Sequence, residues 1–272
     1  MQPIVVLDEE LNDQINRRKI IEQEFKKALR ENEFTVFYQP KVHAITGELI
    51  GAEALCRWFE NGRMIPPGEF IPVLEDSYRI TELDMAMLRL ACRDIAGWEK
   101  EGKAVPISVN VSRRDLSDQE LFNTIISIIE EAGISKENII IEITETSSEK
   151  EKGMMMKFLN QLQKSGIKSS IDDFGSGYSS LSVLREFPVS EIKLDRSFIN
   201  KELNKKDEII IRSIIEMAAN LGVDIIQEGV EIEEQEAFVS NLGCSKIQGF
   251  LYSSPLPKAE FDRWVKAGRR PE

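Results

Sequence analysis

The sequence predicts an α/β protein folded as a (β/α)8 TIM-like barrel with an antiparallel first strand. The chain has 272 residues, of which 42% are hydrophobic, and it is therefore long enough to bury a core of barrel size. Eight short apolar or β-branched segments recur along it, and helical patterns separate most of them. Alternating strands and helices produce parallel sheets, so the pattern favours a closed barrel, with an open doubly wound sheet as the alternative.

The connection between the first two strands predicts their antiparallel pairing. Residues 34–40 and 49–58 are rich in aromatic, β-branched and other apolar residues, and only about eight residues separate them. A parallel crossover needs a dozen or more residues, so these strands should form a hairpin. The six strands that follow are predicted at residues 105–111, 138–144, 167–172, 191–195, 223–228 and 245–248.

Helical patterns account for most of the remaining chain. Before the first strand, apolar residues recur at helical spacing among dense charges over residues 10–31. Ser117 is the expected N-cap of the fourth helix, because Glu120 follows three residues later. The other predicted helices span residues 70–75, 81–101 and 117–133, or end near residues 165, 187, 221 and 242, and a final helix begins near residue 257.

These patterns divide the chain into three parts. We expect a lead-in helix or linker over residues 1–30, a barrel over residues 31–268 and a C-terminal tail over residues 269–272. No apolar run in the sequence approaches the roughly 20 residues that cross a bilayer, and the start of the chain lacks the basic region of a secretory signal. We therefore expect a cytoplasmic protein with no membrane segment of its own.

Composition argues against several classes of function. The formal net charge of −12 disfavours a nucleic-acid polymer as partner, since proteins that bind such polymers carry a basic face. The three cysteines are scattered without a C-x-x-C pair, so neither disulfides nor a zinc site is expected. His43 is the only histidine, and one isolated histidine is more often a loop residue than a catalytic one. The sequence also lacks the glycine-rich dinucleotide motif and the P-loop motif.

Polar residues lie in or at the ends of the second to the eighth predicted strands, in otherwise apolar company. Each has a structural explanation on its own, such as a glutamate paired with an outer helix or Lys193 paired with Asp195. One polar residue on each successive strand is poorly explained in that way, because the carboxyl ends of barrel strands converge on one mouth. The residues are Glu53, Asn110, Glu142, Asp172, Lys193, Glu228 and Gln248.

The adjacent Asp172 and Asp173 are central to this pattern. They follow an apolar segment and precede a loop with glycines at positions 175 and 177. Such a stretch can be a simple turn, but it can also aim two carboxylates at Mg²⁺ or Mn²⁺. Two cations about 3.5–4 Å apart can hold a phosphodiester and activate a water molecule, with Lys193 close to that water. An enolase-like Mg²⁺ lyase, which does not need the adjacent pair, is an alternative.

The same residues stand in motifs that resemble one known family. Glu53-Ala54-Leu55 resembles the signature that names the EAL domain, a family of bacterial phosphodiesterases for the second messenger cyclic di-GMP. This resemblance implies hydrolysis of cyclic di-GMP to linear pGpG, which lowers the level of the messenger. Ordered motifs carry it over roughly residues 31–264, at residues 38–40, 70–72, 109–112, 142–145, 172–181, 193–198, 228–231, 248–250 and 255–257.

The resemblance implies a role for each matching position at the reacting phosphate. It implies two cations per site, Mg²⁺ or Mn²⁺, bridged by Asp172. One cation would be held by Glu53, Asn110, Glu142 and Asp172, and the other by Asp172, Asp173 and Glu228. The implied catalytic residues are Glu228 as general base, Lys193 beside the attacking water, Gln248 near the metal, and Glu53.

The resemblance also implies how the domain binds its substrate and its partners. Gln39, Arg57, Asp195 and Glu231 would contact the dinucleotide. A homodimer is expected, with substrate and metal binding coupled to dimerisation by Glu145, Asp173, Phe174 and Gly175. The alternative for Glu145 is a charge favoured at a helix N-terminus. The lead-in resembles the segment that joins a GGDEF-type domain to an EAL domain, so we expect an upstream regulatory domain.

The chain departs from the usual family pattern at four places. Residues 76–80 read Asp-Ser-Tyr-Arg-Ile where the family usually has Glu-Thr-Gly-Leu-Ile, and Ser176 replaces a threonine. Lys41 replaces a usual isoleucine, and Gln227 replaces a usual alanine. None of these changes removes an implied metal ligand. A catalytically silent receptor for cyclic di-GMP, which typically lacks ligands, is therefore the less favoured alternative.

Overall fold

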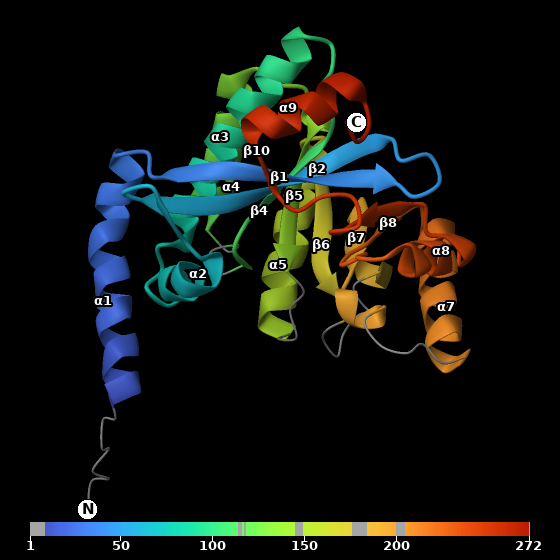
Figure 1. Ribbon diagram of the computed structural model, residues 1–272, viewed down its shortest axis with the longest axis horizontal. Helices are drawn as coiled ribbons and strands as arrows, with labels where there is room; N and C mark the ends of the chain where they lie inside the picture. Colours follow the sequence, from blue (N-terminus) through green and yellow to red (C-terminus); the bar gives the residue numbers. More distant parts are fainter. Residues whose placement is uncertain are drawn as a thin grey trace, which may run out of the picture.

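Eight strands close into a barrel at the centre of the fold (Figure 1). The structure is a computed structural model that describes residues 9–113, 116, 118–144, 149–175, 184–199 and 205–271, without the side chains of residues 9–15, 149 and 150. The barrel strands are β1 (Phe34–His43), β2 (Leu49–Glu60), β4 (Ile107–Asn110), β5 (Ile139–Thr144), β6 (Lys168–Phe174), β7 (Glu191–Leu194), β8 (Asp224–Gln227) and β9 (Lys246–Gln248).

The pairing of β1 closes the barrel and confirms the predicted fold class. This strand is antiparallel to both β2 and β9, and its register with β2 shifts at Lys41 and Val42. All other neighbours around the barrel are parallel. The fold is therefore a (β/α)8-like barrel with an antiparallel first strand, as the short connection after residue 40 predicts.

Two short strands extend the barrel beyond the prediction. β3 (Arg63–Ile65) pairs with β2, and β10 (Leu256–Pro257) pairs with β1, both antiparallel. Segments of two or three residues are too short to show an alternating pattern. The sequence still signals the β3 hairpin through the pair Asn61-Gly62. In the structure these two residues have φ angles of 49° and 80°. Asn-Gly is the preferred pair for a two-residue hairpin turn that needs two positive φ angles.

Helices surround the barrel, and the start of one of them corrects a prediction (Figure 1). The N-cap of α4 is Asp118, whose carboxylate accepts a 2.9 Å hydrogen bond from the backbone N–H of Glu120. The prediction of Ser117 as N-cap is wrong because the helix begins one residue later than expected. The described helices include α1 (Glu9–Arg30), α2 (Pro67–Asp76), α3 (Ile80–Lys100), α4 (Gln119–Ala132), α5 (Glu149–Lys164), α7 (Lys205–Leu221), α8 (Glu233–Asn241) and α9 (Lys258–Ala267).

The central parallel strands are buried on both faces, so a polar residue within them points into the barrel or lies beneath other elements. β5 reads Ile-Ile-Ile-Glu-Ile-Thr, and its Glu142 has no exposed surface. All four residues of β7 are buried. Because side chains alternate along a strand, Glu191 and Lys193 of β7 lie on the same face. Both side chains take part in the ion pairs that fill the barrel.

The second half of α1 packs against the barrel. Ile21 and Phe25 are buried, and the Phe25 ring lies 5.7 Å from the ring of Phe34 on β1. The guanidinium of Arg79 donates a 2.9 Å hydrogen bond to the carbonyl of Glu22. The lead-in helix predicted over residues 10–31 therefore shares the aromatic core at the start of β1.

The turn between α2 and α3 contains a residue in an unfavourable backbone conformation. Tyr78 has a φ angle of 57°, in the left-handed region, and its side chain is 70% exposed. Glycine adopts this region freely, whereas other residues pay about 1–2 kcal/mol for it. Members of the family usually have glycine at the position of Tyr78. The replacement of that glycine by tyrosine in this chain therefore carries a conformational cost.

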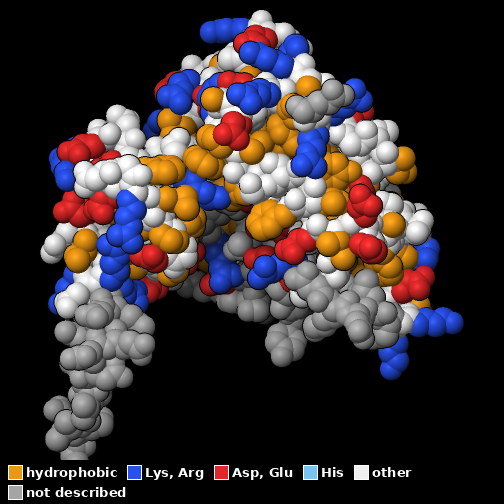
Figure 2. All heavy atoms as spheres, in the orientation of Figure 1, with side chains coloured by type: hydrophobic (Ala, Val, Ile, Leu, Met, Phe, Trp, Pro, Cys, Tyr) orange, Lys and Arg blue, Asp and Glu red, His pale blue; other side chains and the backbone are white. Residues whose placement is uncertain are grey.

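Over the described residues, no helix combines the length and the apolar character needed to span a membrane. Figure 2 shows basic, acidic and apolar side chains interspersed over one face, without a continuous basic stripe among the coloured residues. The charge is therefore distributed over this face and not gathered in one patch.

We expect the Tyr78→Gly variant to be more stable than the wild type. Relief of the left-handed strain exceeds the entropy that glycine adds to the unfolded chain, so the free energy of unfolding should rise by about 0.5–1 kcal/mol. Urea unfolding measures this change. Tyr78→Ala is the control, because it removes the ring and keeps the strained Cβ. An equal gain in both variants would assign the effect to the ring and contradict the backbone explanation.

Candidate active site

The polar residues predicted on successive strands converge at one end of the barrel. Each lies in its strand or directly after it, and strand register brings neighbours to the same height. Asn110 pairs with Glu142 across β4 and β5, and Gln39 pairs with Glu53 across β1 and β2. The structure thus brings together Glu53, Asn110, Glu142, Asp172, Asp173, Lys193, Glu228 and Gln248.

Lys193 is the centre of this cluster. Its side chain is 1% exposed, and its Nζ lies 3.0 Å from Glu53 Oε2 and 3.0 Å from Asp172 Oδ1. The same Nζ lies 2.8 Å from Glu228 Oε1 and contacts Glu142 Oε1. Burial alone would lower the pKa of this ammonium, but the surrounding carboxylates outweigh burial and hold the pKa well above its usual value. Lys193 is therefore charged at the bottom of an acidic site.

Amide donors fix the orientation of Glu53. Asn110 Nδ2 donates a 2.9 Å hydrogen bond to Glu53 Oε1, and Gln248 Nε2 donates a 2.7 Å bond to Oε2. Gln248 Nε2 also lies 3.0 Å from Gln39 Oε1. Burial would raise the pKa of Glu53, but Lys193, Lys41 and the two amides together lower it to about 2. This carboxylate consequently stays ionised at neutral pH.

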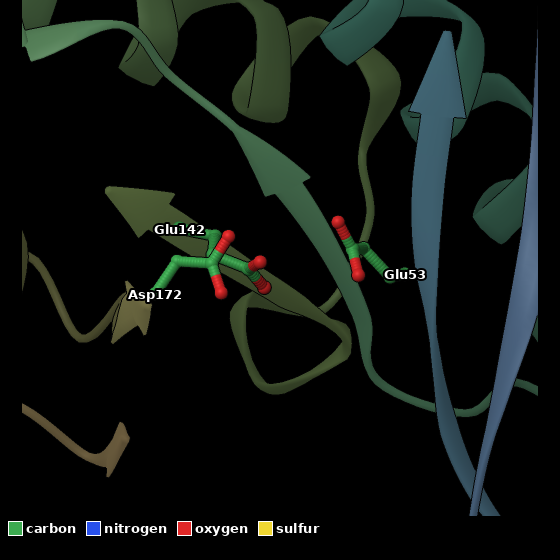
Figure 3. A group of neighbouring side chains, drawn as sticks. All are labelled: Glu53, Glu142 and Asp172. Atoms are coloured by element: carbon green, nitrogen blue, oxygen red, sulfur yellow. The ribbon is translucent and has the colours of Figure 1, made fainter. Parts of the chain in front are cut away.

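Glu142 lies in the same cluster with a different environment. Burial raises the pKa of Glu142 well above its usual value, and the neighbouring charge of Glu53 adds to this effect. Lys193 and Lys41 oppose this rise without cancelling it, and the side chain has no exposed surface. Figure 3 shows the carboxylates of Glu53, Glu142 and Asp172 directed toward the space between their strands. Added positive charge in this space would keep Glu142 ionised.

Glu228 has a pKa close to neutral. Its side chain is 19% exposed at the end of β8, and burial raises its pKa to about 7. Lys193 lowers this pKa, whereas Asp172 and Glu53 raise it. Glu228 can therefore take up and release a proton near pH 7.

A local change of backbone turns Asp173 toward the same site as Asp172. Adjacent residues in a regular strand point to opposite faces. Here the register of β6 with β7 shifts between Ile171 and Phe174, and Asp173 has a φ angle of 53°. Its backbone N–H donates a 2.9 Å hydrogen bond to Asp172 Oδ1. Strain of this kind is often kept at functional sites.

The carboxylates fit the requirements of divalent cations. One group of ligand oxygens, from Glu53, Glu142 and Asp172, lies within 4.8 Å of one another, and so does a second group from Asp172, Asp173 and Glu228. Asp172 belongs to both groups. Carboxylate oxygens are the ligands that Mg²⁺ and Mn²⁺ prefer. The described residues thus provide two neighbouring acidic groups that share one aspartate.

Two cavities flank the acidic cluster. A cavity of about 610 Å³ is lined by Arg57, Asn110 and Asp173, among others, and a second of about 230 Å³ by Gln39, Asp195, Glu231 and Asp173. The Arg57 guanidinium lies 5.5 Å from the centre of the Phe37 ring. The Asp195 carboxylate accepts a 2.9 Å hydrogen bond from the backbone N–H of Ser197. The four residues predicted to contact substrate therefore line these two cavities, on either side of Asp173.

The predicted coupling loop is described only at its start. Phe174 is fully buried, and Gly175 has a φ angle of 97°. A Cβ at Gly175 would lie 2.2 Å from the Phe198 ring, so only glycine fits there. Glu145 and residues 176–183 lie outside the described residues.

Sequence reasoning missed a polar layer beneath the cluster. Lys41 on β1, Ser108 on β4 and Glu191 on β7 are buried inside the barrel. A signal for this layer was present, because Ser108 and Glu191 precede Asn110 and Lys193 by two residues and therefore share their face. Burial would lower the pKa of Lys41, but Glu191 and Glu142 raise it above its usual value.

Gln227, which replaces a usual alanine of the family, forms hydrogen bonds to the backbone beside Glu228. Gln227 has no exposed surface, and its Nε2 donates hydrogen bonds to the carbonyls of Glu228 at 3.0 Å and Leu194 at 3.3 Å. Its side chain therefore ties the end of β8 to the end of β7.

The fold and the site define a class of protein, an α/β barrel with a buried acidic centre at the carboxyl ends of its parallel strands. The profile of the EAL domain family matches residues 22–255. The chain belongs to this family, which the sequence motifs predict and the comparison confirms.

Relatives and a solved structure agree with this assignment. The chain is 36% identical to the bifunctional diguanylate cyclase/cyclic di-GMP phosphodiesterase MucR of Pseudomonas aeruginosa over 86% of its length, and 33% identical to the cyclic di-GMP phosphodiesterase PdeR of Escherichia coli over 96%. It spans 35% and 40% of these relatives. A structure of the MucR phosphodiesterase in complex with cyclic di-GMP matches 89% of this chain and 99% of that chain, with 34% identity and a TM-score of 0.82.

The raised pKa of Glu228 predicts an unusual pH dependence of stability in the metal-free protein. The folded-state pKa of about 7 lies above the ordinary value of 4.5, so the folded chain binds a proton that the unfolded chain releases. The free energy of unfolding should therefore rise as pH falls from 8 to 5.5, by about 2 kcal/mol. Urea unfolding with a chelator present measures it. The Glu228→Gln variant cannot titrate at this position and should change less, whereas equal changes would contradict the assignment.

The contacts of Lys193 predict that the metal-free fold depends on its charge. In Lys193→Met, buried carboxylates face one another without their ammonium, which should lower the free energy of unfolding by about 3–5 kcal/mol. Millimolar Mn²⁺ should restore part of this loss, because it supplies positive charge at the same oxygens. Thermal unfolding with and without Mn²⁺ measures both effects. Lys205→Met, at an exposed position, is the control, and equal stability of the two variants would contradict the prediction.

Proposed function

We propose that this chain is a metal-dependent phosphodiesterase that hydrolyses cyclic di-GMP to linear pGpG. The observation that carries the proposal is the convergence of carboxylates, Asn110, Lys193 and Gln248 from successive strands on one site. Support comes from PdeR and MucR, which are named as cyclic di-GMP phosphodiesterases, and from the MucR complex that matches this fold. In bacterial signalling the reaction would lower the level of the messenger.

Two divalent cations, Mg²⁺ or Mn²⁺, are the proposed cofactors. When bound, they would polarise the phosphodiester and lower the pKa of the attacking water. The two acidic groups that share Asp172 support this stoichiometry. The proposed ligands are Glu53, Asn110, Glu142 and Asp172 for one cation, and Asp172, Asp173 and Glu228 for the other.

The protein's own catalytic groups surround the same position. Glu228 is the proposed general base, because its carboxylate lies at the end of β8 beside Lys193 and is partly exposed. Lys193 would orient the attacking water and stabilise the negative charge that develops on the phosphate oxygens. Gln248 would hold Glu53 by the 2.7 Å hydrogen bond that it donates to Oε2. Glu53 is thereby kept ionised and fixed in direction.

The two cavities suggest how a cyclic dinucleotide is held. Arg57, in the larger cavity, would contact a phosphate, since a guanidinium matches phosphate geometry. Gln39, Asp195 and Glu231 line the smaller cavity, where Glu231 would face a guanine. Asp173 lines both cavities. The dinucleotide would therefore span the acidic cluster with one half on each side.

The assembly of the domain is part of the proposal. The chain spans about a third of the length of the curated relatives that it matches, such as 32% of a signalling protein of Caulobacter vibrioides. This supports an upstream regulatory or GGDEF-type domain, with residues 1–30 as lead-in, residues 31–268 as barrel and residues 269–272 as tail. The homodimer, its coupling through Glu145, Asp173, Phe174 and Gly175, and the cytoplasmic location stay predictions.

Chromatography of the reaction products tests the function. The purified chain should convert cyclic di-GMP to pGpG with Mg²⁺ or Mn²⁺ and lose this activity with a chelator. Glu53→Gln should lower kcat/KM by more than about 100-fold, since losing even an outer hydrogen-bond partner of a metal ligand costs about 10–100-fold. Glu60→Gln, on the same strand and outside the cluster, is the control and should keep wild-type activity.

Each other outcome has a definite meaning. Tight binding of cyclic di-GMP by calorimetry, with no turnover under either metal, would identify a receptor and reject the enzyme. The absence of both binding and turnover would reject cyclic di-GMP as the ligand.

A further inference from the structure

A buried lysine that the proposed reaction does not use lies directly beneath the candidate active site. Lys41 on β1 is 3% exposed, and its side chain points into the barrel. Its Nζ donates a 2.6 Å hydrogen bond to Ser108 Oγ and a 3.0 Å hydrogen bond to Glu191 Oε1. These contacts hold the ammonium in one place, between β4 and β7.

The held ammonium faces one oxygen of a proposed metal ligand. Lys41 Nζ lies 3.8 Å from Glu142 Oε2, whereas Lys193 contacts the other oxygen, Oε1. Glu142 has no exposed surface, and among the described residues its Oε2 has no hydrogen-bond donor. The two lysines therefore approach the same carboxylate through different oxygens.

Strand geometry explains why the two lysines belong to different layers. Glu191 and Lys193 are two residues apart on β7, and so are Ser108 and Asn110 on β4, so each pair shares a face at successive heights. Lys41 thus lies in the layer of Glu191 and Ser108, one step below the layer of Lys193. The lower pair of Lys41 and Glu191 has no net charge, but its ammonium lies 3.8 Å from Glu142 Oε2, close enough to attract that oxygen.

We propose that Lys41 is a positioning residue that holds Oε2 of Glu142 toward the floor of the barrel and so presents Oε1 to the bound cation. This inference rests on the proposed function, because it concerns a ligand of the proposed metal site. The replacement of the usual isoleucine by Lys41 then affects how a ligand of the proposed metal site is oriented. An apolar residue at position 41 would leave Glu142 Oε2 without a nearby cation in the lower layer.

The alternative is that Lys41 only neutralises Glu191. A buried ion pair can be replaced by apolar residues with little loss of stability, whereas removing one partner leaves an uncompensated charge. The test therefore compares Glu191→Met, which keeps the ammonium of Lys41, with Lys41→Met/Glu191→Met, which removes both charges. Methionine carries no charge and so cannot substitute for the ammonium that lies 3.8 Å from Glu142 Oε2.

The measured quantity is the dissociation constant for Mn²⁺, obtained by calorimetry on the folded, metal-free chain. Glu191→Met should bind Mn²⁺ within about threefold of the wild type. Lys41→Met/Glu191→Met should bind it about 10-fold or more weakly, the loss expected when a ligand loses an outer partner. Urea unfolding confirms that both proteins are folded. If Glu191→Met fails to fold, the double variant is compared directly with the wild type.

Two results would overturn the inference in distinguishable ways. Wild-type Mn²⁺ affinity in a folded double variant would show that Lys41 serves only Glu191, while the metal site and the proposed function stand. Failure of the wild type itself to bind Mn²⁺ would reject the proposed metal site and this inference together.

Discussion

The burial of charge inside a closed sheet is the constraint on which the site depends. Lys193 is 1% exposed and Glu142 has no exposed surface, so neither side chain can be solvated by water. An isolated ion in such a position would cost several kcal/mol, and each charge therefore requires the others. The carboxylates come from β2, β5, β6 and the end of β8. The ammonium of Lys193 therefore has all its ion-pair partners only when these strands have reached their positions in the closed barrel. Fold and site are consequently specified by the same contacts.

The reversed direction of β1 adds side chains that a parallel strand would place elsewhere. Gln39 and Lys41 are two residues apart, and each reaches the barrel interior, Gln39 beside Gln248 and Lys41 beside Glu191. One strand thus supplies a neutral hydrogen-bond acceptor for Gln248, in the layer of Glu53, and a cation to the layer below. The polar interior has at least two levels, and the deeper one is almost completely shielded from solvent. Its contribution to the upper level is therefore mechanical and electrostatic.

Much of the fold and most of the site were predictable because strands and site residues have strong local signals. Eight segments with period-two or apolar patterns became the eight barrel strands, and polar residues within them became the cluster. The failures have physical causes. β10 has too few residues to show a pattern, and the N-cap was misplaced by one residue because Ser117 and Asp118 are both residue types that favour this position. The spacing of Ser108 and Glu191 indicated a buried polar layer, but their contacts with Lys41 were not predictable, because these residues are distant in sequence and meet only when the barrel closes.

The pairing of β1 with β9 has a consequence for synthesis of the chain. Gln39 and Gln248, which are hydrogen-bonded in the folded protein, are 209 residues apart in sequence. On the ribosome, the first strand is therefore exposed long before its last partner emerges, and contacts this distant carry a large loop-closure entropy. Before β9 pairs with β1, the barrel is open and its interior lysines and glutamates are hydrated. The desolvation free energy of these side chains therefore opposes the step in which the barrel closes. A nascent chain that ends before β9 therefore lacks the strand that pairs with the second edge of β1 and closes the barrel.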